Sequence, residues 1–200
     1  MSSPALLFDI GNVLVRFDFT VAAQRLAALA DRTTEEVMEL LGPFKDDLEC
    51  GPISDEDFIA QSMGRIGFRE TREEFIRIWG DIFTENAPMT TVVEQLAAEH
   101  PLYLLSNTSG LHKEWLMANF PVFRHFTAGI FSHEACCMKP HEPIFRVAME
   151  SFGLDASRTL YIDDLADNIA TGQRLGFVCH HYHPDRHEAF QDALRAWRGK

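Results

Sequence analysis

Short, continuous apolar runs recur along the chain and predict buried strands. They fall at residues 5–10, 102–105, 128–131, 159–162 and 177–179. Runs of this length without polar alternation are typical of strands that are covered on both faces. Between the later runs, apolar residues recur at helical spacing in 89–99, 141–153 and 165–175. Alternating strands and helices from residue 89 onward predict an α/β fold, with a parallel sheet and helices on both of its faces.

Residues 17–87 interrupt this alternation, because they show helical patterns and no convincing strand. Ser54 and Asp57 form the two ends of a helix-capping pattern, and an apolar helical face follows them. Thr71 precedes another such face, which continues as far as Phe83. This stretch is therefore predicted to be all-helical.

The helical stretch divides the chain into two predicted domains. A chain of 200 residues suits one domain that carries a modest insert. We expect a core made of residues 1–16 and 88–200, and a small helical cap made of residues 17–87. The hinges between them are expected at 16–18 and 85–88.

Polar residues stand where the predicted strands end. Asp9 ends the first strand and leads into a glycine turn, and Ser106 ends the second. Asp163 and Asp164 follow a later strand, and Lys139 lies before that strand in the sequence. Each alone has an ordinary interpretation as a turn residue, a helix cap or a solvated charge. Together they predict a phosphoryl-transfer site, because ligands of open parallel sheets bind beyond the carboxyl ends of the strands.

This ordered set resembles the haloacid dehalogenase superfamily, in particular its members with a helical cap inserted after the first strand. The resemblance covers nearly the whole chain. Phe-Asp-Ile-Gly around Asp9 matches the nucleophile motif, and Leu-Ser-Asn around Ser106 matches the second motif. Lys139 before a proline matches the third, and Asp-Asp-x-x-x-Asn from Asp163 matches the fourth. The resemblance implies a Rossmann-like core, a Mg²⁺ cofactor and an aspartyl-phosphate intermediate.

The resemblance also implies a metal site. Mg²⁺ is expected to bridge Asp9 and a phosphoryl oxygen, because a carboxylate and a phosphate dianion otherwise repel each other. Asp164 and Asp163 are expected to be further ligands, together with the backbone carbonyl of Gly11, and such oxygen ligands suit Mg²⁺. Asn168 lies one helical turn after Asp164 and is expected to orient it.

The same resemblance assigns roles toward the substrate. Asp9 would attack phosphorus in line and so divide hydrolysis into two easier displacements. Lys139 would neutralise the developing charge, while Ser106 and the amide of Asn107 would hold the transferring group.

Gly11 is a departure from the superfamily's hydrolytic phosphatases, which usually carry a second aspartate there as general acid and base. Its absence removes a contribution of ~10²–10⁴ in rate, or roughly 3–5 kcal/mol. The leaving group can be one that needs little protonation, such as that of an anomeric sugar phosphate or an acyl phosphate. A cap residue or water can supply the proton, or the reaction can be a different one. Asp-x-Gly-Asn-Val resembles a bacterial branch that includes an α-D-glucose-1-phosphate phosphatase, which favours the first explanation.

The segment 49–53 falls where related capped enzymes place a substrate-specificity loop. Its Gly-Pro turn would present Glu49 or Lys45 to the substrate, although a plain turn between helices explains it equally well. A phosphonatase would need a cap lysine, and Lys45 is the only lysine in residues 17–87. A dehalogenase typically has a bulky aromatic residue where this chain has Gly11.

Composition adds limits on partners. The net charge of −12, from 18 basic and 30 acidic residues, argues against a nucleic-acid surface. No run approaches the roughly 18 apolar residues of a membrane span, and no basic flank precedes the first apolar run. We expect a cytoplasmic monomer or weak homodimer that binds a small phosphorylated substrate. The alternative function that is not enzymatic is that of a non-catalytic protein that binds phosphorylated metabolites.

Overall fold

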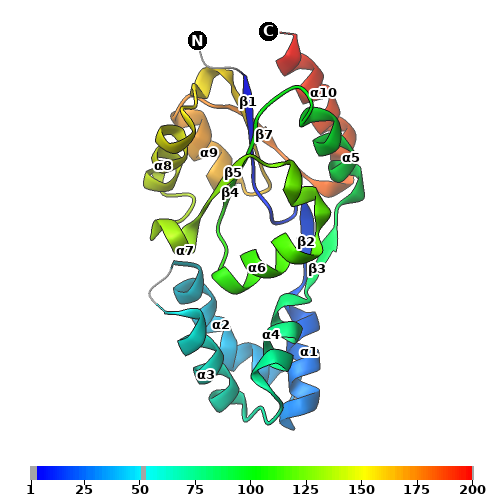
Figure 1. Cartoon of the computed structure of the whole chain (residues 1–200), viewed down its shortest axis with the longest axis vertical. Helices are drawn as coiled ribbons and strands as arrows, with labels where there is room; N and C mark the ends of the chain where they lie inside the picture. Colours follow the sequence, from blue (N-terminus) through cyan, green and yellow to red (C-terminus); the bar gives the residue numbers. More distant parts are fainter. Residues whose placement is uncertain (1–3, 51–52, 200) are drawn as a thin grey trace.

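The main sheet has five parallel strands in the order β5-β4-β1-β6-β7 (Figure 1). The computed structural model describes residues 4–50 and 53–199, apart from the side chains of residues 45, 46 and 50. The strand bounds are β1 Ala5–Phe8, β4 Leu102–Ser106, β5 Ala128–Phe131, β6 Thr159–Asp163 and β7 Val178–His181. These are the strands predicted from the apolar runs, with ends that differ by at most two residues. The predicted parallel sheet is confirmed.

Helices cover both faces of this sheet. They are α5 Ala87–Leu96, α6 Gly110–Asn119, α7 Ser132–Ala135, α8 Glu142–Phe152, α9 Ala166–Arg174 and α10 His187–Arg198, with short 3-10 turns η1 Pro121–His125, η2 Ala156–Arg158 and η3 Pro184–Arg186. Leu6 and Phe8 of β1 pack in one cluster with α5, α6 and α10. Leu7, between them, packs on the other face with α8 and α9. Because successive side chains point to opposite faces, strands covered on both sides must be apolar throughout.

The helical insert spans residues 19–80 and forms, with Leu111 of α6, a further hydrophobic cluster. Its helices are α1 Phe19–Ala30, α2 Thr34–Cys50, α3 Asp55–Ile66 and α4 Arg72–Gly80. Phe58, Phe75 and Trp79 belong to a cluster that is separate from the two clusters of the sheet. Ser54 and Thr71 cap α3 and α4, as their positions predicted. In Figure 1 these helices lie beyond the carboxyl edge of the sheet.

A two-stranded antiparallel ribbon joins the insert to the sheet, and the sequence did not predict it. The ribbon consists of β2 Val15–Phe17 and β3 Phe83–Glu85, with Phe17 opposite Phe83. The four helices of this stretch are present, but the prediction that residues 17–87 contain no strand was wrong, and α4 ends at Gly80, before Phe83. Strands of three residues are too short to show the alternation by which strands are recognised. Figure 1 shows the ribbon between the sheet and the helices of the insert.

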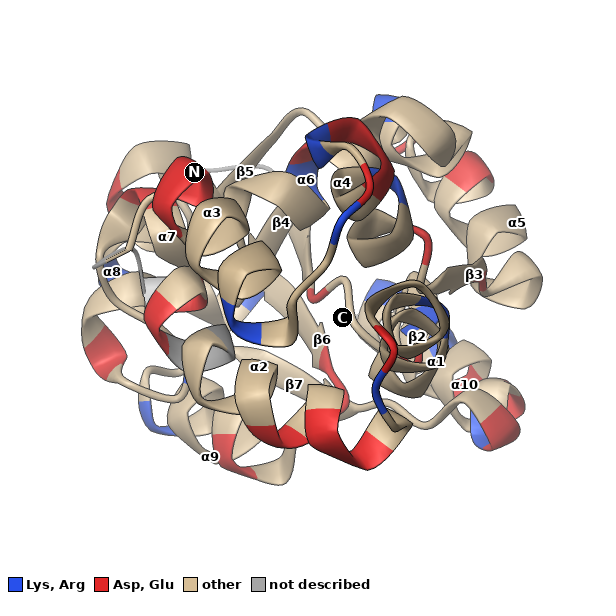
Figure 2. Ribbon diagram, turned by 90° about the horizontal axis from the view of Figure 1, so that it is seen from below, with Lys and Arg blue, Asp and Glu red and all other residues tan. Residues whose placement is uncertain are grey.

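In the view of Figure 2, Asp and Glu outnumber Lys and Arg, and the basic residues are spread over several helices. Within residues 4–50 and 53–199, no helix has both the length and the apolar character that a membrane crossing needs.

Candidate active site

Three neighbouring strands, β4, β1 and β6, bring polar residues to the carboxyl edge of the sheet. Asp9 directly follows β1, and Ser106 is the last residue of β4. Asp163 is the last residue of β6, with Asp164 next. The backbone N–H of Asp9 donates to the carbonyl of Ile162 at 2.9 Å, which fixes the start of its loop against β6. The strand order therefore places these residues side by side.

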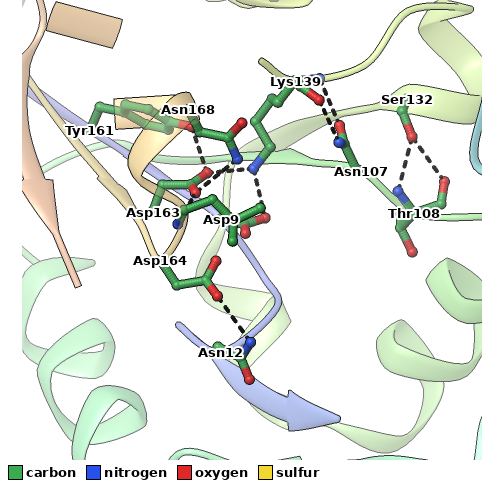
Figure 3. Close-up of polar contacts among 11 residues, drawn as sticks. Asp9, Asn12, Asn107, Thr108, Ser132, Lys139, Tyr161, Asp163, Asp164 and Asn168 are labelled. Carbon is green, nitrogen blue, oxygen red and sulfur yellow. Dashed lines mark hydrogen bonds and ion pairs between the residues drawn. The ribbon is translucent and has the colours of Figure 1, made fainter. Parts of the chain in front are cut away.

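Lys139 forms a buried ion-pair network with two of these carboxylates (Figure 3). Its Nζ lies 2.9 Å from Oδ1 of Asp9 and 2.7 Å from Oδ2 of Asp163. The Lys139 side chain is 1% exposed, and that of Asp9 is 10% exposed. Burial raises the pKa of Asp9 to about 7, although the nearby ammonium of Lys139 acts to lower it. One buried cation is thus shared between two acids, and the charge of Asp9 is only partly balanced.

Asp163 is held by donors on both of its oxygens. Oδ2 accepts from Lys139 at 2.7 Å and from the hydroxyl of Tyr161 at 2.6 Å. Oδ1 accepts from the backbone N–H of Leu165 and from Nδ2 of Asn168, both at 2.9 Å. Burial acts to raise the pKa of Asp163, but Lys139 and these hydrogen bonds lower it overall. Asp163 is therefore a charged anchor for Lys139.

The position of Asn168 corrects an expectation. The sequence placed it one helical turn after Asp164 and assigned it to orient that residue, but its side-chain amide donates to Asp163. The residue that contacts Asp164 is Asn12, whose Nδ2 donates to Oδ2 of Asp164 at 2.9 Å (Figure 3). Asn12 has a left-handed φ of 52°, which turns its side chain back to this carboxylate. Sequence reasoning missed this residue, although Asn after Gly at a strand end is a signal for such a turn.

Asp9, Asp163 and Asp164 form a cluster that suits a metal ion. One carboxylate oxygen of each lies within 4.8 Å of the others. An all-oxygen donor set is the chemistry of Mg²⁺ and Ca²⁺, whereas Zn²⁺ favours His and Cys ligands. The raised pKa of Asp9 is a second sign of fit, because a divalent cation would balance its charge. Gly11 borders the same cavity, and the expected role of its carbonyl stays a prediction.

The loop after β4 is tied to the segment that carries Lys139. The side-chain amide of Asn107 brackets the backbone of Lys139, donating to its carbonyl at 2.9 Å and accepting from its N–H at 2.8 Å. The N–H of Thr108 donates to Oγ of Ser132 at 2.9 Å (Figure 3). Ser106, at the start of the loop, is 2% exposed. The side chain of Asn107 thus positions Lys139, a function that sequence reasoning missed.

A cavity opens beside these residues. On the sheet side its lining includes Asp9, Gly11, Asn12, Ser106, Asn107, Lys139, Asp164 and Asn168. From the insert, the ribbon and α6 it includes Phe17, Phe19, Glu49, Phe83 and His112. Glu49 therefore borders the cavity, and its contact with substrate stays a prediction. The side chain of Lys45, the other candidate in this segment, lies outside the described part of the structure, as does the Gly-Pro turn at 51–52.

Comparison with known proteins gives the family. Residues 4–176 match the model of the haloacid dehalogenase-like hydrolases. The chain belongs to this family. It is 29% identical over 182 residues to D-ribitol-5-phosphate phosphatase of Bacteroides thetaiotaomicron, covering 86% of this chain and 88% of that protein.

Solved structures show the same fold. A haloacid dehalogenase family enzyme of Bacteroides thetaiotaomicron, crystallised with magnesium and inorganic phosphate, is 25% identical, with a TM-score of 0.78 over 90% of this chain and 93% of that chain. A haloacid dehalogenase-like hydrolase of Porphyromonas gingivalis is 26% identical, with a TM-score of 0.80 over 96% and 98%. An L-2-haloacid dehalogenase of Xanthobacter autotrophicus is 18% identical, with a TM-score of 0.62 over 89% and 76%, and shares the fold alone.

Proposed function

We propose that this hydrolase is a Mg²⁺-dependent phosphatase that acts on a small phosphorylated sugar through a phosphoryl intermediate on Asp9. The observation that carries the proposal is the arrangement at the sheet edge. Lys139 bridges Asp9 and Asp163, and Asp164 completes an acidic cluster beside a cavity. The relative named as a phosphatase and the similar enzyme crystallised with magnesium and phosphate support the same chemistry.

The charged residues of the site have different proposed roles, in metal binding or toward the phosphoryl group. Asp9 and Asp164 would hold Mg²⁺ with the carbonyl of Gly11, while Asp163 already has donors on both oxygens and serves Lys139 instead. Bound Mg²⁺ would supply positive charge where the carboxylate and the phosphoryl oxygens approach. Asp9 must be ionised to attack phosphorus, and Lys139 at 2.9 Å stabilises that form. Lys139 also stabilises the negative charge that develops on the transferring group.

The phosphoryl group then passes to water. In-line attack by a carboxylate oxygen of Asp9 forms a bond to phosphorus while the bond from phosphorus to the bridging oxygen breaks, and the leaving group departs with that electron pair and takes a proton from water. Water attacks the same phosphorus, loses a proton to solvent or to the departing carboxylate, and regenerates Asp9. Ser106 and the backbone amide of Asn107 are proposed to hold the phosphoryl oxygens, since both residues line the cavity.

The leaving group is proposed to be a sugar bound under the helical insert, which would act as a cap. Glu49 offers a carboxylate that can accept hydrogen bonds from sugar hydroxyls. Glycine at position 11 favours a leaving group that needs little protonation, such as an anomeric hexose phosphate. The similarity to a D-ribitol-5-phosphate phosphatase favours a sugar alcohol phosphate as the second candidate.

A panel of phosphate esters tests both the activity and the substrate. The panel should contain glucose 1-phosphate, glucose 6-phosphate, ribitol 5-phosphate and p-nitrophenyl phosphate, with Mg²⁺ or with EDTA. We expect phosphate release that requires Mg²⁺ and is lost in Asp9→Asn, with glucose 1-phosphate preferred. Absence of Mg²⁺-dependent release from every ester would favour the non-catalytic binding protein. Activity retained by Asp9→Asn would remove the nucleophile from the proposal.

A further inference from the structure

The space beside Gly11 is filled by the ring of Phe17. A Cβ atom at position 11 would lie 2.9 Å from Cε1 and 3.5 Å from Cδ1 of that ring. The backbone does not itself require glycine, because the residue with the left-handed φ in this turn is Asn12. Position 11 is therefore restricted to glycine sterically, because any side chain there must displace the ring of Phe17.

Phe17 is fixed by the ribbon and by neighbouring rings. It is the last residue of β2 and stands opposite Phe83 of β3. Its ring lies edge-on to that of Phe19, with centroids 5.6 Å apart, and 6.4 Å from that of Phe83. All three rings line the cavity that contains Asp9. Phe17 is nevertheless 37% exposed, so part of its ring faces open space.

The rings of Phe17, Phe19 and Phe83 form an aromatic wall of the cavity that Asp9 also lines, and such a surface can discriminate between leaving groups. Aromatic surfaces bind apolar faces, and a cyclic sugar offers a face of C–H groups with its hydroxyls around the rim. Glu49 borders the same cavity and can accept from those hydroxyls. An open-chain sugar alcohol has no comparable flat face. The aromatic wall therefore suits a ring better than a chain.

We infer that Phe17 is a specificity-determining residue that packs against the ring of a cyclic sugar leaving group, and that Gly11 is the residue that makes room for it. This inference rests on the proposed phosphatase function and deepens it. The two positions act as a pair: a side chain at position 11 and an aromatic ring at position 17 compete for one space.

A double-mutant cycle tests the pair. Gly11→Ala, which adds only the Cβ atom, is combined with Phe17→Leu, and kcat/KM is measured with Mg²⁺ for glucose 1-phosphate and acetyl phosphate. Phe17→Leu should lower kcat/KM for glucose 1-phosphate by about tenfold, and for acetyl phosphate, whose leaving group is small, by less than about twofold. Gly11→Ala should also lower kcat/KM for glucose 1-phosphate more than for acetyl phosphate, and should add little to that difference in the Phe17→Leu background. Phe17→Tyr, which keeps the ring, should keep the selectivity.

The control is Tyr103→Leu, which removes another half-buried ring. Tyr103 stacks on Phe152 with centroids 4.3 Å apart and does not line the cavity, so its loss should not change the ratio between the two substrates. Equal effects of Phe17→Leu on both substrates, or additive effects of the two substitutions, would overturn the inference while leaving the phosphatase intact. A wild-type protein that hydrolyses other esters of the panel but not glucose 1-phosphate would also overturn the inference alone, whereas one that hydrolyses none of these compounds with Mg²⁺ would overturn the proposed function.

Discussion

The buried carboxylate of Asp9 should make the metal-free protein less stable than its Asp9→Asn variant. Burial, the largest cause, raises the pKa of Asp9 from 3.8 to about 7, even though Lys139 lies beside it. Each tenfold change in a protonation equilibrium is about 1.4 kcal/mol, so this change corresponds to roughly 4 kcal/mol. Because the raised pKa already includes the attraction of Lys139, that figure approximates the net cost of the charged form relative to a neutral side chain.

The sign of the effect follows from proton binding. Between pH 3.8 and about 7 the folded protein keeps the proton of Asp9 and the unfolded chain releases it. The folded state then binds more protons, so the stability of the metal-free wild type falls as pH rises through this window. At pH 8, Asp9→Asn should be more stable by up to roughly 4 kcal/mol, and at pH 5.5 by roughly half of that.

Urea unfolding in EDTA at the two pH values measures this difference. Asp192→Asn is the matched control, because it removes one acidic charge from the surface of α10, where an ion pair contributes about 0–1 kcal/mol. An Asp9→Asn variant that is no more stable than wild type at pH 8 would refute the reasoning. A gain of equal size at both pH values would refute it as well, since the effect must follow ionisation of Asp9.

Three further predictions concern residues around the site and the C-terminal helix. Asn12→Ala should raise the Mg²⁺ concentration for half-maximal activity by about 10–100-fold, because Asn12 orients Asp164; an unchanged requirement would count against this role. Tyr161→Phe removes a donor to Asp163 and should lower the free energy of unfolding by about 1–2 kcal/mol in urea titrations, whereas unchanged stability would show that this hydrogen bond contributes little. Burial lowers the pKa of His187 below 6.5, so the contribution of its neutral ring to stability is lost as pH drops below about 6.5, and the free energy of unfolding of the wild type minus that of His187→Gln should decrease over this range.

Much of the site was predictable because each main residue follows an apolar run. Asp9, Ser106 and Asp163 stand at the ends of parallel strands, and the carboxyl ends of such strands meet at one edge whatever the details of the loops. Lys139 could be assigned only through the resemblance, since nothing in its own surroundings predicts that its ammonium reaches two carboxylates. Strand order, which decides that β4 and β6 flank β1, was not predicted, because the apolar runs themselves carry no information on which strands are neighbours.

The remaining features depend on backbone geometry that leaves little trace in sequence. Asn12 reaches Asp164 because its φ is left-handed. Asn168 reaches Asp163 because α9 begins at Ala166, which puts Asn168 in the first turn of that helix. The ribbon of β2 and β3 is too short for an alternation signal, so the position of Phe17 against Gly11 was hidden as well. Contacts between segments that are distant in sequence, more than local conformational propensity, determine the positions of Asn12, Asn168 and Phe17.

The measurement that tests the central claim most directly is the detection of the phosphoryl group on Asp9 during turnover. The wild-type protein, mixed with Mg²⁺ and its best phosphate ester, is quenched in acid, and its peptides are examined by mass spectrometry. The account predicts a peptide that spans Asp9 and carries the mass of one phosphoryl group, and no such peptide from Asp9→Asn. Turnover with the phosphoryl group on a different residue, or with none on the protein at any time, would contradict it.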